Sequence, residues 1–123
     1  MGEANNFRIK IDRLVHKVYD LTLKFPKEEM FCLTSQLRRA ILSVPANAIE
    51  GYARGRGKVF LSQMEIAYGS LAEAKYYLNF ACKRAYMTKQ EYLDVWKDSE
   101  EISKMLWSGI MTLKKRVNQK DVG

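Results

Sequence analysis

Apolar residues recur along the chain every three or four positions, in four long segments that short polar stretches separate. This spacing is the period of one face of an α-helix. The pattern predicts helices at about residues 7–25, 27–52, 58–84 and 89–117. The positions expected to face the core are Ile11, Leu14, Val18, Leu21 and Phe25; Met30, Leu33, Leu37, Ile41, Val44 and Ala48; Phe60, Met64, Ala67, Leu71, Ala74, Leu78, Ala81 and Ala85; and Tyr92, Val95, Ile102, Leu106, Gly109 and Leu113.

Four local signals set the expected helix boundaries. Pro26 ends the first helix, because a proline disfavours helical angles in the residue before it. Pro45 removes one backbone hydrogen bond inside the second helix and predicts a kink there. Gly51 indicates the end of the second helix. The run Thr88-Lys89-Gln90-Glu91 fits a capping box at the start of the fourth.

Short connections between long amphipathic helices imply antiparallel neighbours. We therefore predict an all-α, up-down-up-down antiparallel four-helix bundle. A chain of 123 residues is large enough for one hydrophobic core, so residues 1–123 are expected to form a single domain. The two prolines and the many Leu, Ala, Lys and Glu residues favour helices over strands.

The predicted fourth helix carries a second apolar face. At about 100° per residue, Leu93, Trp96, Trp107 and Met111 fall about 120–180° away from its core positions. Exposed tryptophans in a cluster usually mark an interface, so these residues predict an oligomer interface. The alternative is a wide contact with another helix of the same chain.

A polar stripe follows the second helix at steps of three and four. Gln36, Arg39, Ser43, Asn47 and Glu50 share one face. One interpretation is a partly buried hydrogen-bonded network that fixes helix register, and the other is a solvated face. A catalytic role is the weakest interpretation, because the stripe offers a carboxylate but no nucleophile and no metal-binding set.

The chain is basic, with 21 Lys and Arg against 14 Asp and Glu and a net charge of +7. Such an excess is typical of proteins with a polyanionic partner. In the predicted bundle, the start of the first helix, the connection between the second and third, and the end of the fourth share one end. The basic residues there, which we predict to bind nucleic acid, are Arg8, Lys10, Arg13, Arg54, Arg56, Lys58, Lys114, Lys115 and Arg116. The alternative is an acidic protein partner that binds the same basic end.

Residues 51–58, GYARGRGK, resemble a phosphate-binding loop only superficially. A Walker-type loop would need glycine where Tyr52 stands and Ser or Thr where Val59 stands, and it would follow a strand. Gly55 and Gly57 are better explained as turn residues.

Other chemistry is sparse. His16 is the only histidine, and Cys32 and Cys82 lack C-x-x-C spacing, so we expect reduced packing cysteines and no metal site. No apolar run reaches the ~18 residues of a membrane span, and the N-terminus lacks the apolar core of a signal peptide. We expect a cytoplasmic, non-enzymatic protein without a cofactor. Because most aromatic residues follow the helical seams, a base-stacking platform is a minor alternative.

Several motifs together resemble a known family. They are Phe25-Pro26-Lys27-Glu28-Glu29, residues 33–40 (LTSQLRRA), residues 43–47 (SVPAN), Glu50-Gly51-Tyr52 and residues 69–73 (GSLAE). In this order they are similar to the bacterial four-helix-bundle proteins encoded in large-subunit ribosomal RNA intervening sequences. The same fold family includes the accessory variability determinant of diversity-generating retroelements. The resemblance covers about residues 7–115.

This resemblance implies a non-enzymatic bundle that assembles as a ring-like homopentamer. In retroelement members, a basic barrel binds nucleic acid and the cognate reverse transcriptase. Residues and resemblance together predict an oligomeric, nucleic-acid-binding accessory protein. Its expected partners are further copies of itself, RNA or DNA, and a reverse transcriptase, with no membrane partner.

Overall fold

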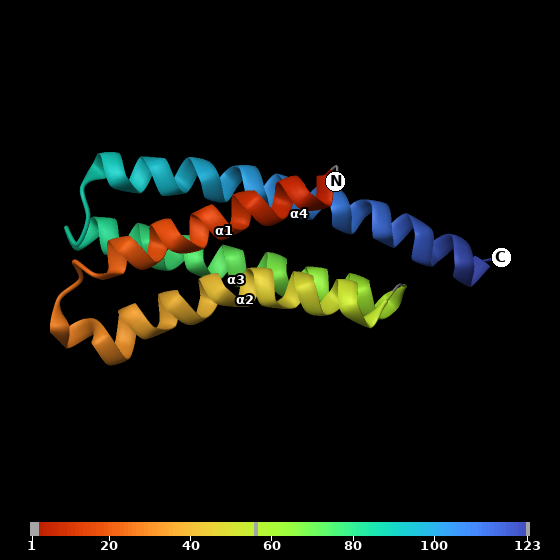
Figure 1. Cartoon of the computed structure of the whole chain (residues 1–123), viewed down its shortest axis with the longest axis horizontal. Coiled ribbons are helices and arrows are strands. Elements are labelled where there is room, and N and C mark those ends of the chain that lie inside the picture. Colours follow the sequence, from red (N-terminus) through yellow and green to blue (C-terminus); the bar gives the residue numbers. More distant parts are fainter. Residues whose placement is uncertain (1–2, 56, 123) are drawn as a thin grey trace.

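Four α-helices form the bundle, and each runs opposite to the one before it (Figure 1). The computed structural model describes residues 3–55 and 57–122. The elements are α1 (Glu3–Thr22), a 3₁₀ turn η1 (Lys27–Glu29), a π-helical turn η2 (Met30–Thr34), α2 (Ser35–Arg54), α3 (Lys58–Lys83) and α4 (Lys89–Val122). No strand occurs within those ranges. The prediction of an all-α, up-down-up-down four-helix bundle is therefore confirmed.

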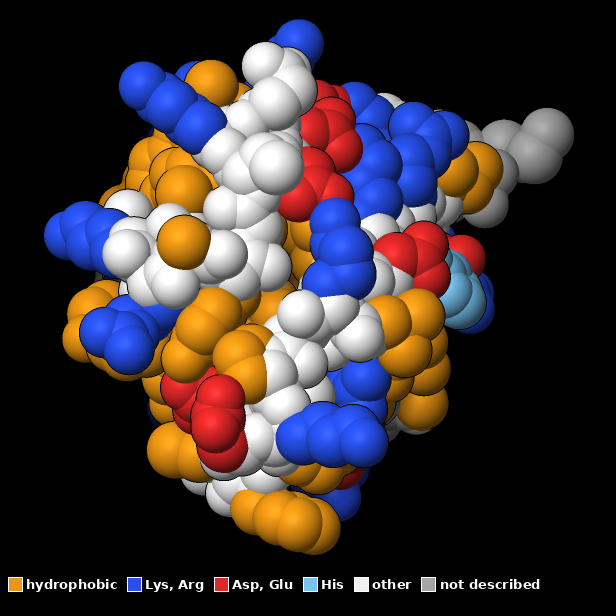
Figure 2. All heavy atoms as spheres, turned by 90° about the vertical axis from the view of Figure 1, so that its left-hand side faces the viewer, with side chains coloured by type: hydrophobic (Ala, Val, Ile, Leu, Met, Phe, Trp, Pro, Cys, Tyr) orange, Lys and Arg blue, Asp and Glu red, His pale blue; other side chains and the backbone are white. Residues whose placement is uncertain are grey.

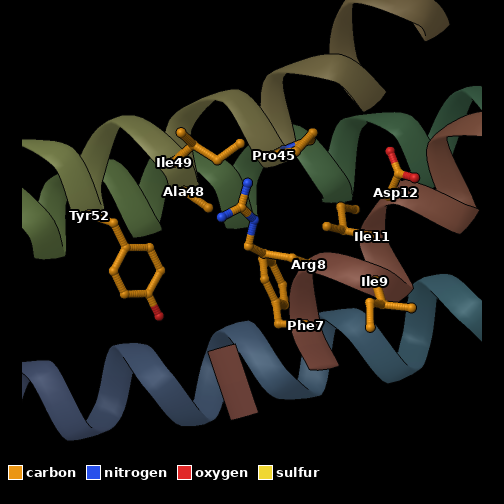
Figure 3. A pocket seen from close by; sticks show the side chains of 9 residues that line it. All are labelled: Phe7, Arg8, Ile9, Ile11, Asp12, Pro45, Ala48, Ile49 and Tyr52. Carbon is orange, nitrogen blue, oxygen red and sulfur yellow. The ribbon is translucent and has the colours of Figure 1, made fainter. Parts of the chain in front are cut away.

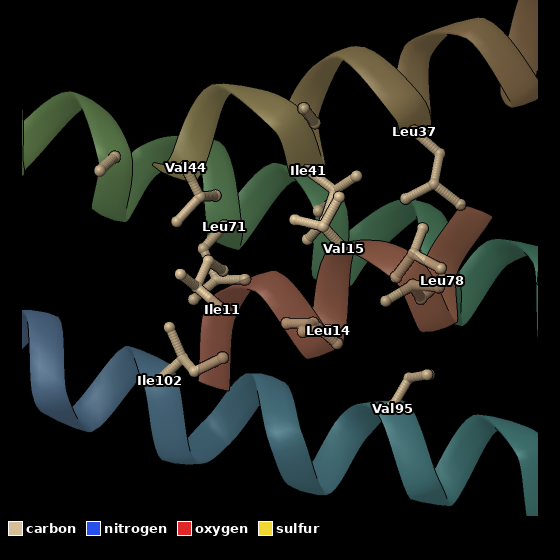
Figure 4. Close-up of a cluster of buried hydrophobic side chains, with 14 of the residues drawn as sticks. Ile11, Leu14, Val15, Leu37, Ile41, Val44, Leu71, Leu78, Val95 and Ile102 are labelled. Carbon is tan, nitrogen blue, oxygen red and sulfur yellow. The ribbon is translucent and has the colours of Figure 1, made fainter. Parts of the chain in front are cut away.

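The core lies along the bundle axis and draws side chains from all four helices (Figure 4). Ile11, Leu37, Ile41, Leu71 and Ile102 are among its fully buried residues. Burial of each such side chain contributes about 1.5–3 kcal/mol, so these contacts dominate the stability of the fold. Most of the predicted core positions are buried or packed against the core.

Three predicted core positions are wrong. Met30 is 46% exposed and Ala85 lies at the surface. In α4, Ile110 is only 2% exposed, while its neighbour Gly109, the predicted core position, lies at the edge of the core. The core-facing side of α4 also includes Ser99, which is fully buried. Its hydroxyl donates a hydrogen bond to the Val95 carbonyl at 2.6 Å, and this satisfies the buried polar group.

The π-helical turn explains the error at Met30. Its hydrogen bonds close over five residues instead of four, which shifts the side chains around the axis relative to an α-helix. Phe31 is 94% exposed. Cys32 is also exposed, so the prediction that Cys32 packs in the core is wrong. The Glu29 carboxylate caps the turn by accepting the Leu33 N–H at 3.4 Å.

Gly51 does not end the second helix, contrary to prediction. The helix continues to Arg54 and stops at Gly55, whose φ of 113° favours glycine, as does the φ of 76° at Gly57. A Cβ at position 51 would lie 3.0 Å from the Gln63 Cβ and 3.1 Å from the Phe60 ring. Gly51 therefore permits the close approach of α2 and α3 near their connection.

The connection between α3 and α4 is closed by two capping motifs. Ala85 has a φ of 62°, with the Tyr86 N–H bonded to the Ala81 carbonyl at 2.9 Å, as in a Schellman motif. The predicted capping box is confirmed. The Thr88 hydroxyl accepts the Glu91 N–H at 3.1 Å, and the Glu91 carboxylate accepts the Thr88 N–H at 2.9 Å.

Ion pairs at regular spacing connect α1 to α4. The three lysines that take part are seven residues apart, two in α1 and the third just after its end, and their partners run in the opposite direction along α4. The pairs are Lys10 with Glu101, Lys17 with Asp94 at 3.1 Å and Asp98 at 2.7 Å, and Lys24 with Glu91. This spacing fits only one antiparallel register of the two helices.

Two of these groups have shifted pKa values. The hydrogen bond from Lys24, followed by that from the Thr88 backbone, lowers the pKa of Glu91 below its ordinary value. The hydrogen bond to Asp98 is the main cause that raises the pKa of Lys17. Each charged form is therefore favoured in the folded state.

Replacing Ala85 with glycine should stabilise the protein by about 0.5–1 kcal/mol, because glycine adopts a positive φ without steric cost. Urea unfolding measures the change. Ala72, exposed in the middle of α3, provides the matched control, since Ala72→Gly should destabilise by a similar amount. A lower midpoint for Ala85→Gly would contradict the assigned backbone conformation.

Replacing Glu91 with glutamine should make the stability of the fold decrease less as the pH falls into the acid range. Because the folded-state pKa of Glu91 is depressed, its contribution is present above pH 4.5 and is lost as the pH falls through the lower, folded-state pKa. Thermal unfolding between pH 6 and pH 3 measures the difference. Glu28→Gln, at an exposed carboxylate without an ion pair among the described residues, should follow the wild-type profile.

Candidate nucleic-acid interface

Three segments that are far apart in the sequence lie at one end of the bundle. Figure 1 shows the start of α1, the α2–α3 connection and the end of α4 toward the right-hand side, with the end of α4 extending past the other two. Arg13 of the predicted set lies further back, near Asp98 and Glu101 in the middle of α4, but the antiparallel topology brings these three segments toward a common end. We call this the basic end. Arg56 lies outside the described residues, and Lys58 is the exposed first residue of α3.

The basic side chains differ in their local partners. Lys10 pairs with Glu101, Arg54 with Glu50 at 3.2 Å and Lys114 with Glu65 at 3.7 Å. In contrast, four exposed cations have no carboxylate partner among the described residues. They are Arg8, Arg13, Lys115 and Arg116. Carboxylates nevertheless lie near two of them, since Asp12 lines the same pocket as Arg8, and Asp98 and Glu101 line the same pocket as Arg13.

The opposite end carries charges of both signs. Figure 2 faces this end and shows Lys and Arg side chains interspersed with Asp and Glu. Lys24 and Glu91 form an ion pair here, and Glu29 accepts a hydrogen bond from the Tyr86 hydroxyl at 2.9 Å. The acidic groups at this end therefore offset its basic side chains locally.

A groove of about 640 Å³ opens at the basic end. Its walls come from the start of α1, the end of α2, the start of α3 and residues 101–116 of α4. Basic side chains and aromatic rings both line it. They include Lys10, Lys104 and Arg116, together with Phe7, Tyr52 and Phe60. We call this the end groove.

A second groove, of about 670 Å³, lies between α1 and α2 (Figure 3). Its walls are mainly apolar, with Ile9, Pro45 and Ile49 among them, and the Arg8 side chain extends across it. Tyr52 and Phe7 border both grooves. In Figure 3 the Tyr52 ring extends from α2 toward α4, which places it between the two openings.

The predicted oligomer face of α4 is partly exposed. Leu93, Trp96 and Trp107 are 45%, 37% and 50% exposed, and Met111 packs partly against the core. Each tryptophan also contacts its own chain. The Trp107 ring lies 5.5 Å from that of Tyr68, and the Lys75 ammonium lies 5.1 Å from the centroid of Trp96. This face thus combines contacts to α3 with exposed aromatic surface.

The polar stripe of α2 divides into two parts. Gln36, Arg39 and Glu50 are exposed, so they lie outside any buried network. The half-buried Ser43 and Asn47 do form a hydrogen-bonded network. This network also includes Ser70 of α3, which the sequence analysis did not predict. The Asn47 amide donates to Ser43 at 2.8 Å, and the hydroxyls of Ser43 and Ser70 lie 2.9 Å apart across the α2–α3 contact.

The described residues contain no cluster of three His, Cys, Asp or Glu side chains that is able to hold a metal ion. His16 lies 3.5 Å from Asp12, both side chains being largely exposed. Within the described ranges, none of the helices has an apolar stretch long enough to cross a bilayer.

The fold and the basic end define an all-α bundle protein with a polarised charge distribution. A family model described as the 23S rRNA-intervening sequence protein matches residues 5–108. Because this match spans most of the chain, the protein belongs to that family.

Comparison with curated proteins gives no match. Among solved structures, the chain is similar to a protein with unknown function from the S23 ribosomal protein family of Bacteroides thetaiotaomicron, determined at 1.70 Å resolution. The TM-score is 0.78 at 25% identity, covering 85% of this chain and 97% of that one. Neither this structure's description nor that of the family model mentions retroelements or a reverse transcriptase, so this part of the resemblance stays a prediction.

Proposed function

We propose that this protein is a non-catalytic RNA-binding protein whose basic end contacts the phosphate backbone. The observation that carries the proposal is a set of four exposed cations without an ion pair among the described residues, Arg8 and Arg13 on α1 and Lys115 and Arg116 in the last part of α4. Lysine and arginine side chains that neutralise phosphates release counterions, which drives binding and makes it dependent on salt. The family name refers to a ribosomal RNA intervening sequence, and this favours RNA as the polyanion.

Because these cations lie on two different helices, the proposed RNA-binding surface is wider than a single loop. Arg8 and Arg13 lie on α1, while Lys115 and Arg116 lie in the last part of α4. An acidic protein surface is the alternative partner. RNA is preferred because Arg116, together with Lys10 and Lys104, lines a groove that also contains aromatic rings, a combination typical of nucleic-acid binding.

Titration of labelled RNA at several salt concentrations tests the proposal. The wild type should bind with an affinity that falls steeply as salt rises, since each phosphate contact adds about one unit to the slope of log affinity against log salt. Arg8→Ala/Arg13→Ala and Lys115→Ala/Arg116→Ala should each reduce that slope by up to about two.

Lys83→Ala/Arg84→Ala is the matched control. It removes the same charge from exposed positions at the opposite end of the bundle. It should leave the slope within about half a unit of the wild-type value, because these residues lie away from the proposed contacts. Equal effects of all three double variants would show that net charge alone drives binding. Absence of RNA binding at low salt would exclude the proposed function.

We also propose that the exposed part of the α4 face joins copies of the chain, with a homopentamer as the expected assembly. Light scattering should give a multiple of the 14.3 kDa chain mass. Leu93→Lys/Trp107→Lys should lower that mass, because it places charge on a face that association would bury. Leu23→Lys, at an exposed apolar residue beyond the end of α1, should leave the mass unchanged. A monomeric wild type would contradict this assembly.

A further inference from the structure

We propose that the end groove binds RNA as a single strand, with a base stacked on Tyr52. This inference rests on the proposed RNA binding and specifies the form of the RNA. It follows from the register of α1, the exposure of Tyr52 and the positions of two cations on α4.

The register of α1 opens the groove. Because Lys10 pairs with Glu101 in an antiparallel arrangement, the backbone of Glu3 comes level with Ser108. The helix α4 continues to Val122, so its last fourteen residues extend past the described start of α1. Figure 1 shows this part of α4 beyond the start of α1. Its residues Gly109, Thr112, Leu113 and Arg116 line the end groove together with Tyr52 of α2 and Phe60 of α3.

Tyr52 is placed to contact a ligand in this groove. It is 52% exposed, and its ring lies 4.8 Å from that of Phe60 at an angle of 50° between the planes. Phe60 therefore supports one side of the ring, while the remainder faces the two grooves that it borders. Its hydroxyl has no hydrogen-bond partner among the described residues. A supported, accessible aromatic ring is what base stacking requires.

Two exposed cations line the same groove. Lys104 and Arg116 are twelve positions apart on α4, which corresponds to about 18 Å along the helix axis. Neither has a carboxylate partner among the described residues. Phosphates several nucleotides apart, on either side of the stacked nucleotide, would meet positive charge, as in channels that bind single strands.

A duplex fits this arrangement poorly. Its bases are already stacked on one another and paired, so none is free to enter a groove and reach Tyr52. Only its phosphates would contact the basic end. The combination of an accessible ring and flanking cations therefore favours the unpaired strand.

The test compares a single-stranded RNA containing 2-aminopurine with a blunt duplex of the same length and sequence. We expect tighter binding of the single strand and a fluorescence change as the probe base stacks on Tyr52. Tyr52→Ala should lose about tenfold in affinity for the single strand and should abolish the fluorescence change. Tyr52→Phe, which retains the ring, should restore both.

Tyr76→Ala controls for loss of an exposed tyrosine outside the groove and should bind like the wild type. Circular dichroism checks that each variant is folded, and wild-type fluorescence provides a test that needs no variant. Equal or tighter binding of the duplex, or no fluorescence change with the wild type, would overturn the inference. If the Arg8→Ala/Arg13→Ala effect persisted in that case, backbone binding would stand, whereas absence of binding to either RNA would exclude both.

Discussion

The antiparallel register between α1 and α4 is the constraint on which the candidate site depends. Core burial supplies most of the stability, since each fully buried Leu or Ile contributes about 1.5–3 kcal/mol. Exposed ion pairs contribute only about 0–1 kcal/mol each. Nevertheless, the ion pairs that Lys10, Lys17 and Lys24 make with carboxylates of α4 form only when the two segments align in one register. That alignment leaves the last part of α4 beyond the described start of α1, and the end groove extends from beside α1 into this region.

The same arrangement separates two kinds of surface. The start of α1 and the ends of α2 and α4, which carry basic residues, lie toward one end because an even number of antiparallel helices returns the chain to the end where it began. The aromatic residues of α4 lie along the side of the bundle instead, where Trp96 and Trp107 contact α3 and remain partly exposed. A polyanion at the end and further copies along the side would therefore not compete for the same surface.

Sequence periodicity was a reliable guide where the backbone was regular. It located the core positions of α1 and α3 almost completely, because a constant 100° per residue maps spacing directly onto one face. It failed at Met30, where a π-helical turn changes that angle. The glycine signal failed at Gly51, where glycine permits a helix–helix contact instead of ending a helix. The lysines at positions 10, 17 and 24 recur every seven residues, which the sequence alone shows. Their carboxylate partners can be identified only when the position of α4 beside α1 is known.

The sequence alone determined the all-α class, the number of helices, the capping box at Thr88 and the segments that supply the basic end. These follow from local hydrogen bonding and from the period of apolar residues, which neighbouring positions carry. Only the tertiary structure decided which cations lack partners, how far α4 extends past α1, and that Tyr52 borders two grooves. Those properties depend on distances between residues remote in sequence, and such distances are fixed when the four apolar faces pack together.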